Sequence, residues 1–420
     1  MRKNPKFGSF CTTYNICMKL RYQYRIYPNG QQVKQLAKQF GCCRVVWNDA
    51  LARVKAVPQG ERWPSNVQLQ KLCITEAKKT EQRSWLVEVS NIPLQQSIAD
   101  LGVAFKNFFE SRSGKRQGRK VGFPRFKKKL NRQSARFRKG GFSLENNKVY
   151  LAKIGTIKTK WSRPLPSEPS SVTVIKDRAG RYFLSFVVDM ESAIEPAQQA
   201  AVGVDLGIKT FATLSNGEKV AGPSYSLLNR QIRRAQRVLS RRQKGSRRRK
   251  RARLRVAKLK AKLRDIRRDF LHKLSTWLVR AYSVVALEDL NVSGMVKNRC
   301  LARAISEQGW AEFRALSESK ADRYDSREVR VISRWEPTSQ YCAGCGYHWG
   351  KLDLSVRELR CLGCGRQQDR DGNAGRNIRN VVLGQSETQN GQGATVRPGY
   401  PARCDELSTR LADRLSESAG

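Results

Sequence analysis

Apolar positions along the chain recur with two different periods, and the changes between them predict strand-rich and helical regions. Residues 20–27 (LRYQYRIY) alternate as in a strand and end at the turn signal Pro28-Asn29-Gly30. Strand patterns return over 142–190 in KVYLAK, SVTVIKD and RYFLSFVVDM. Three stretches between them have helical spacing: about 31–56, 66–80 and 93–111. Residues 1–195 are therefore expected to form a small β-barrel or sheet with a helical insertion at about 31–111.

The pattern changes at Ala201, where an α/β region begins. VGVDLGI and TFATLS predict a pair of strands, with Asn216-Gly217 suited to the tight turn that follows. Two amphipathic helices joined at Gly245 come next, within about 227–271. SVVALEDL (283–290) predicts a buried strand that ends in acids, residues 301–330 a helix, and VRVISRW a further strand. We expect residues 196–383 to form a second domain.

The net charge of the chain limits the kinds of partner that it can bind. The 420 residues have a net charge of +47, and such self-repulsion has to be met by a polyanion. Nucleic acid is the first candidate and an anionic membrane the second. No apolar run approaches the roughly 18 residues that span a bilayer, and the N-terminus has no secretory pattern. We therefore expect a cytoplasmic protein, nucleoid-associated in a prokaryote, with no membrane partner.

Two basic segments are candidate nucleic-acid surfaces. Residues 112–139 hold thirteen Lys or Arg and no acid, interleaved with Phe123, Phe126 and Phe137. Rings can stack on bases while cations meet phosphates, which favours an ordered binding surface over a solvated charge run. Residues 230–268 hold twenty Lys or Arg and one acid. Their helices favour an intramolecular hairpin along a nucleic-acid backbone, with a coiled-coil dimer as the alternative.

Four cysteines have the spacing of a zinc site. Cys342 and Cys345 form one C-x2-C pair, and Cys361 and Cys364 form a second pair after fifteen residues. Two such pairs can close a tetrahedral thiolate site around one Zn²⁺. The sequence therefore predicts one structural zinc in a ribbon at about 338–368.

Three carboxylates suggest a second metal centre. Asp205 lies within an apolar strand, Glu288 ends another, and Asp371 precedes a helix-like stretch. Carboxylates on neighbouring strands can hold the two Mg²⁺ ions that phosphodiester hydrolysis uses. The alternative for each acid alone is an ordinary salt bridge in a basic protein. Together, on a chain this basic, they suggest a nuclease.

Four motifs carry a family resemblance. VGVDLGIKTFATLSNG, ALEDLNV, TSQYCAGCG and DRDGNAGRNI resemble the transposon-encoded TnpB proteins, over roughly residues 18–383. The resemblance implies a bilobed α/β protein with an N-terminal β-barrel and an RNase H-like (RuvC) domain that carries an inserted zinc ribbon. It makes Asp205, Glu288 and Asp371 the catalytic residues, with Asp369 the weaker choice for the third. Where many relatives have Ala, this chain has Gly375.

The resemblance also implies an activity, RNA-guided DNA cleavage. A guide RNA derived from the transposon end would direct one protein chain to double-stranded target DNA beside a short flanking motif. Alternatives are a compact type V CRISPR effector, a guide-directed regulator that binds without cleaving, and an RNA-binding zinc protein. The expected nucleic-acid contacts are Trp47, Asn48, Asn66, Gln68, Lys71, Arg119, Lys120, Phe123, Arg125, Lys127, Lys128, Arg247, Arg248 and Arg249.

The last segment, 384–420, is rich in Gly, Gln, Ser, Thr and Pro. Such a composition does not support a packed core, so we expect a disordered tail.

Overall fold

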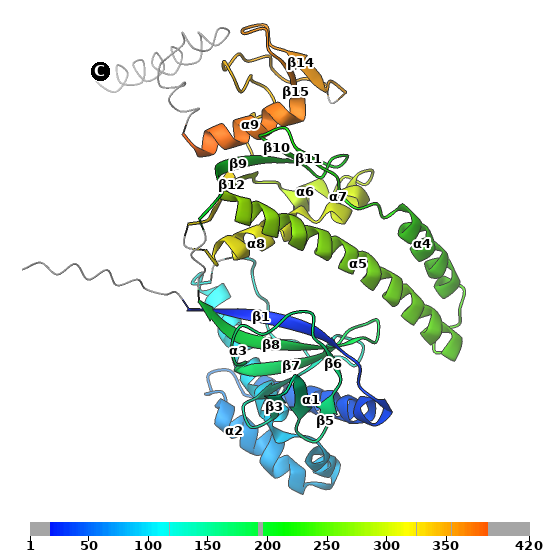
Figure 1. Ribbon diagram of the computed structural model, residues 1–420. Coiled ribbons are helices and arrows are strands. Elements are labelled where there is room, and N and C mark those ends of the chain that lie inside the picture. Colours follow the sequence, from blue (N-terminus) through cyan, green and yellow to red (C-terminus); the bar gives the residue numbers. More distant parts are fainter. Residues whose placement is uncertain (1–16, 117, 192–195, 325, 354, 385–420) are drawn as a thin grey trace, which may run out of the picture. The chain divides into compact units, whose positions relative to one another are not determined.

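A computed structural model (Figure 1) describes residues 17–116, 118–191, 196–324, 326–353 and 355–384. Contacts within the chain divide it into two compact units. The described residues of the first unit lie within 17–191 and 234–259, and those of the second within 196–233 and 260–384. Apart from Gly384, the predicted tail lies outside the described residues.

The first unit is built on an antiparallel sheet in the order β2-β7-β8-β1-β6. Its central strands β1 and β8 pair along their whole length, from Cys17 opposite Glu191 to Ile26 opposite Tyr182. The edge strands β2 and β6 do not pair with each other within the described chain, and β6 has only two residues. The predicted barrel is therefore not found, because so short an edge strand leaves the sheet open. The strands are β1 (Cys17–Ile26), β2 (Gln133–Arg138), β6 (Thr159–Lys160), β7 (Ser171–Lys176) and β8 (Tyr182–Glu191).

Helices and a small sheet complete this unit. Asn29 and Gln32 form a capping box that starts α1, which explains why the helix begins directly after the predicted turn. Helices α1 and α3 bury Leu36, Leu51 and Leu94 in the core that they share with the large sheet. The remaining elements are α1 (Gly30–Lys55), α2 (Asn66–Gln70), a π-helical turn (Lys71–Glu76), two 3-10 turns (Ala77–Lys79 and Glu81–Glu88), α3 (Asn91–Arg112), β3 (Phe142–Glu145), β4 (Lys148–Leu151) and β5 (Gly155–Ile157).

The second unit has a mixed sheet in the order β11-β10-β9-β12-β13. The first three strands are antiparallel neighbours, whereas β12 runs parallel to both β9 and β13. The antiparallel pair β9–β10 confirms the strand pairing predicted for VGVDLGI and TFATLS. The strands are β9 (Gln199–Leu206), β10 (Ala212–Leu214), β11 (Lys219–Val220), β12 (Tyr282–Glu288) and β13 (Glu328–Ile332).

Helices cover both faces of this sheet (Figure 1). Val202 and Val204 of β9 are buried in one core with Leu271 and Leu278 of α5 and Phe313 of α8. Helix α9 lies on the opposite face. The helices wholly within this unit are α6 (Val292–Met295), α7 (Ala302–Gln308), α8 (Trp310–Ala321) and α9 (Arg370–Val382), whereas α4 (Ser226–Ser240) and α5 (Arg247–Ala281) have residues in both units.

The single helix predicted over 301–330 is wrong in extent. Gly309 has φ +75°, a left-handed conformation that ends α7 and redirects the chain into α8, which itself ends at Ala321. By contrast, the two basic helices predicted on either side of Gly245 are confirmed as α4 and α5. Within the described residues, no helix combines the length and apolar character that a membrane crossing requires.

Candidate metal centres

Strand register places Asp205 beside Glu288. Val204 of β9 pairs in parallel with Leu287 of β12, so Asp205 and Glu288 are the next residues on adjacent strands. Side chains alternate between the faces of a sheet. Because Val204 and Leu287 are buried in the α5 face, both carboxylates belong to the face that α9 covers.

Asp371 reaches the same place because α9 lies unusually close to the sheet. A Cβ atom at Gly203 would be 1.9 Å from the carbonyl oxygen of Gly375, and one at Gly375 would be 3.1 Å from the backbone nitrogen of Ser215. Glycine at both positions lets the backbones of helix and strand touch. Asp371 is one helical turn before Gly375, which puts it at the end of β9 where Asp205 lies.

The charges of Glu288 and Asp371 both act on Asp205. Burial, followed by the charges of Glu288 and Asp371, raises the pKa of Asp205 to about 8. Burial also raises the pKa of Glu288, which the hydrogen bond from Thr338 partly offsets. The fold holds these like charges close together against their electrostatic repulsion, and a bound cation would reduce that repulsion. Oxygen ligands of this kind suit Mg²⁺.

The two acids at the start of α9 have different surroundings. The Asp369 side chain caps the helix by accepting from the Gly372 amide at 2.8 Å, and it pairs with Lys219 at 2.8 Å. Asp371 lies in the first turn, where Arg357 Nη1 contacts its two carboxylate oxygens at 3.2 and 3.3 Å. Asp369 is thus occupied in building the helix, whereas Asp371 pairs with the half-exposed side chain of Arg357.

The four cysteines converge, with their sulfur atoms all within 4.8 Å of one another. Each C-x2-C pair forms the same turn. The Gly346 amide donates to the Cys342 carbonyl at 2.9 Å, and the Gly365 amide donates to the Cys361 carbonyl at 2.8 Å. Both glycines have positive φ, +75° and +69°. Strands β14 (Glu358–Arg360) and β15 (Gln367–Asp369) form the hairpin that carries the second pair.

The donor set fits zinc. Thiolates are the binding form of cysteine, and four of them at this separation match a closed tetrahedral structural site. Although burial opposes ionisation of Cys342, the amides of Cys345 and Gly344 and the side chain of Gln368 lower its pKa to about 7. These residues, held by turns with little core of their own, would hold one Zn²⁺ that supplies the missing stability.

Several residues expected to touch nucleic acid have structural contacts within the first unit. Trp47 is 8% exposed and donates from its indole nitrogen to the Arg125 carbonyl, while Lys127 lies 3.6 Å from the centre of its ring. Asn48 exchanges two hydrogen bonds with the backbone of Lys127. Phe123 packs against other aromatic rings, at 5.5 Å from Phe105. These residues therefore fasten the basic segment to α1 and α3.

The other expected contacts differ in exposure. Gln68 is part of the capping box of α2, Asn66 lies against Gly102 of α3, and Lys71 pairs with Glu76 at 3.8 Å. Arg249 closes the α4–α5 turn by donating to the carbonyls of Leu239 and Arg242. The solvent-exposed cations among the expected contacts are Lys71, Arg119, Lys120, Arg125, Lys128, Arg247 and Arg248.

Three polar residues of the centre were not singled out from the sequence. Thr338 donates to the Glu288 carboxylate at 2.7 Å, and Asn373 and Asn377 are fully buried in α9. The signal was present as two asparagines four apart in DRDGNAGRNI, which places them on one face of a helix. Their partner segment could not be identified without the fold.

Known proteins match nearly the whole chain. Family models described as "Probable transposase", "Helix-turn-helix domain" and "Cas12f1-like, TNB domain" match residues 185–299, 18–59 and 310–378. Over 18–59 the structure has strand β1 and the single helix α1. A Streptomyces pristinaespiralis protein named "Putative RNA-guided DNA endonuclease" is 44% identical over 387 residues, 91% of this chain and 92% of its own.

A second relative, InsQ of Escherichia coli (strain K12), bears the same description and is 31% identical over 386 residues, 85% of this chain and 90% of its own. The solved Cas12f1–sgRNA–target DNA complex aligns with 87% of this chain and 100% of that chain, at 14% identity and a TM-score of 0.34, too weak a likeness to carry an argument. The identities to the two relatives, over nearly their full lengths, decide the family: the chain belongs to the TnpB proteins.

Proposed function

We propose that this chain is an RNA-guided DNA endonuclease of a transposon, with a RuvC-type centre formed by Asp205, Glu288 and Asp371. The observation that carries the proposal is the placement of Asp205 and Glu288 on adjacent strands of a mixed sheet, with the charges of Glu288 and Asp371 acting on Asp205. The strand order of that sheet, with an antiparallel trio followed by two parallel strands, supports an RNase H-like domain. The names of the relatives support the guide RNA and DNA as partners.

The carboxylates would hold two Mg²⁺ ions, which when bound activate water and stabilise the leaving 3′ oxygen. Asp205 and Glu288 are fixed by the sheet, so their separation is set before any ligand arrives. Asp371 is positioned by α9, and Arg357 is close enough to exchange its carboxylate partner for a phosphate. The four cysteines would hold one Zn²⁺ and shape the ribbon beside this centre.

The nucleic acids would be held by the exposed cations. A guide RNA from the transposon end would supply sequence recognition by base pairing, so the protein needs backbone contacts more than base contacts. Arg247 and Arg248 on α5 and the exposed cations of 112–139 suit that role. We propose one protein chain for each RNA, with double-stranded DNA as the target.

Single substitutions of the three carboxylates test the proposal most sharply. Asp205→Asn, Glu288→Gln and Asp371→Asn each remove a metal ligand with little change in shape, so guided cleavage should fall by at least about 10³-fold while guided DNA binding persists. Asp369→Asn is the matched control, because asparagine is an equally good N-cap. It should retain cleavage within about tenfold.

Two results would count against this assignment. Full cleavage by Asp371→Asn together with loss in Asp369→Asn would transfer the third ligand to Asp369. A native protein that binds its guided target but never cuts, at any Mg²⁺ concentration, would identify a guide-directed binding regulator instead.

A further inference from the structure

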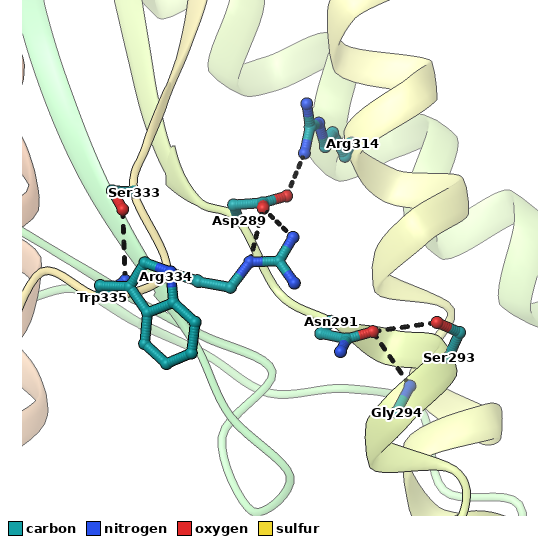
Figure 2. Close-up of polar contacts among 8 residues, drawn as sticks. All are labelled: Asp289, Asn291, Ser293, Gly294, Arg314, Ser333, Arg334 and Trp335. Atoms are coloured by element: carbon teal, nitrogen blue, oxygen red, sulfur yellow. Dashed lines mark hydrogen bonds and ion pairs between the residues drawn. The ribbon is translucent and has the colours of Figure 1, made fainter.

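A short segment connects the zinc ribbon to the carboxylate centre. Residues 333–341, which we call the strut, run from the end of β13 to the first zinc-binding pair. One end is fixed to the loop after β12: Asp289 accepts from Arg334, at 3.0 Å to its Nε, and from Arg314 of α8 at 2.9 Å. Figure 2 shows Asp289 between these two guanidinium groups, with the exposed ring of Trp335 beside them. The strut therefore begins beside Glu288.

Thr338 lies in the middle of the strut and touches the centre directly. Its hydroxyl donates to a carboxylate oxygen of Glu288 at 2.7 Å, and its own carbonyl accepts from Asn377 at 2.6 Å. Thr338 is 6% exposed. A buried hydroxyl with a single charged partner at this distance makes a strong, directional bond. Thr338 thus connects the Glu288 carboxylate to α9.

The far end of the strut is held by the same helix. The Tyr341 carbonyl accepts from Asn373 at 2.8 Å and from Asn377 at 2.9 Å. The Asn373 side chain in turn accepts from the Ala343 amide at 2.8 Å, inside the first cysteine turn. Asn373 and Asn377 are 0% and 1% exposed, so these bonds have no competition from water.

The ribbon's own metal site joins this network. Cys342 follows Tyr341 directly, and Gln368, 7% exposed, donates to the Cys342 sulfur at 3.4 Å. Buried polar networks with every member satisfied hold one arrangement rigidly, and a partly satisfied one does not. The cysteine turns bring little apolar surface of their own, so zinc would be what keeps the Tyr341–Ala343 end of the network in place.

We infer that zinc binding at the four cysteines positions Glu288 through the strut, with Thr338 as the positioning residue. This inference rests on the proposed function, because it takes Glu288 as a metal ligand of the carboxylate centre. It adds that the ribbon and the carboxylate centre are one coupled unit. Loss of zinc would then weaken the binding of a divalent metal ion by the carboxylate centre, even when no nucleic acid is present.

Metal binding by the full-length protein without RNA tests this. Mn²⁺ serves as the probe, and free Mn²⁺ is measured by electron paramagnetic resonance. Thr338→Val keeps the shape but removes the donor, so the Mn²⁺ dissociation constant should rise about 10- to 100-fold, as when outer-shell partners of ligands are removed. Thr338→Ser keeps the hydroxyl and should stay within about threefold. Thr173→Val in β7, in the other unit, should change nothing.

A double variant tests whether zinc binding and Mn²⁺ binding are coupled. Cys364→Ser alters the most accessible ligand and should lose zinc, measured as metal content, with the same rise in the Mn²⁺ dissociation constant. In the double variant Thr338→Val/Cys364→Ser the rise should be no larger than in either single variant, because both changes break one path. Thr338→Ala, which also lacks the hydroxyl, takes the place of Thr338→Val if the latter does not fold.

The outcomes separate the two proposals. Wild-type Mn²⁺ binding by Thr338→Val, or multiplied effects in the double variant, would overturn the inference. Asp205→Asn is measured alongside. If it binds Mn²⁺ as tightly as the wild type, the carboxylate centre itself is wrong. If Asp205→Asn binds weakly and Thr338→Val normally, only the strut's role is wrong.

Discussion

The contact between α9 and β9 gives the sharpest prediction, because one added carbon atom should disable the centre. In Gly203→Ala the new Cβ would lie 1.9 Å from the Gly375 carbonyl oxygen and 2.7 Å from the Arg379 amide nitrogen. Non-bonded heavy atoms pack at about 3.5 Å, so α9 has to retreat by roughly 1.5 Å. Asp371 is carried by that helix and would move with it.

The magnitude follows from that displacement. A misplacement of about 1 Å in a reacting group can cost about 10²-fold in rate, so guided cleavage by Gly203→Ala should fall by about 100-fold or more under single-turnover conditions. Overpacking should also lower the free energy of unfolding by about 1–3 kcal/mol. The assay pairs cleavage of a guide-matched duplex with urea unfolding of the same preparation.

Alanine substitutions at two other glycines provide a comparison for the effect of Gly203→Ala. A Cβ at Gly375 would meet backbone atoms of Thr213, Leu214 and Ser215 at 3.1–3.2 Å, a milder overlap, and alanine is favoured over glycine in a helix by up to about 1 kcal/mol. Gly375→Ala should therefore lose cleavage far less than Gly203→Ala. Gly41→Ala, in α1 with its nearest neighbour at 3.9 Å, should lose nothing. Wild-type cleavage and stability in Gly203→Ala would refute the reasoning.

Other consequences concern protons, zinc and salt. The pKa of Asp205 is raised to about 8, so its contribution to the stability of the metal-free protein is complete below about pH 4 and is lost as the pH rises through about 8. The melting temperature should therefore fall more steeply with rising pH in the wild type than in Asp205→Asn. Equal slopes would contradict the raised pKa. Elemental analysis should find one zinc per chain, lost in Cys361→Ser; native protein without zinc would overturn the ribbon assignment. Guide-RNA affinity should fall steeply with salt. Replacing Arg247 and Arg248 by Gln should reduce the slope of log affinity against log salt by up to about 0.7 for each phosphate that the protein then fails to neutralise. A guide-RNA affinity that does not change with salt would exclude these cations as partners of the RNA backbone.

Local patterns predicted most of the elements. Period and turn chemistry found β1, α1, β9, β12 and the two basic helices, because each has an unambiguous apolar face or a terminal signal. They failed where a single residue outweighed the pattern. Gly309, in a left-handed conformation, divides a segment whose apolar spacing suits one helix. The barrel was wrong because sheet closure depends on the length of β6 and its distant partners, which no local pattern contains.

The sequence pointed to the candidate ligands of the two proposed metal centres but not to the residues that hold those ligands in place. A charged residue at the end of an apolar strand is costly, and that cost is visible in the sequence at Asp205 and Glu288. Four cysteines are equally conspicuous. Thr338 and Asn377 are not, because a threonine in a loop or an asparagine in a helix is ordinary until its buried partner is known. Trp47 and Asn48 show the converse: residues that suit nucleic-acid binding by type are already occupied by the backbone of residues 125 and 127.

Helix α9 contacts both the sheet and the strut, and it carries Asp371 of the proposed carboxylate centre. Its sheet-facing side has Gly375, which permits close approach to β9, and Ile378, which packs with Ala286 and Ile332. Its other buried side has Asn373 and Asn377, which hold the strut. Asp371 stands at the end where the two sides meet. A helix buried on two sides cannot shift toward one without breaking contacts on the other, so the position of Asp371 is fixed from both. Substitutions on either side should therefore disturb the carboxylate centre by different routes: Gly203→Ala by moving Asp371, and Thr338→Val by releasing Glu288.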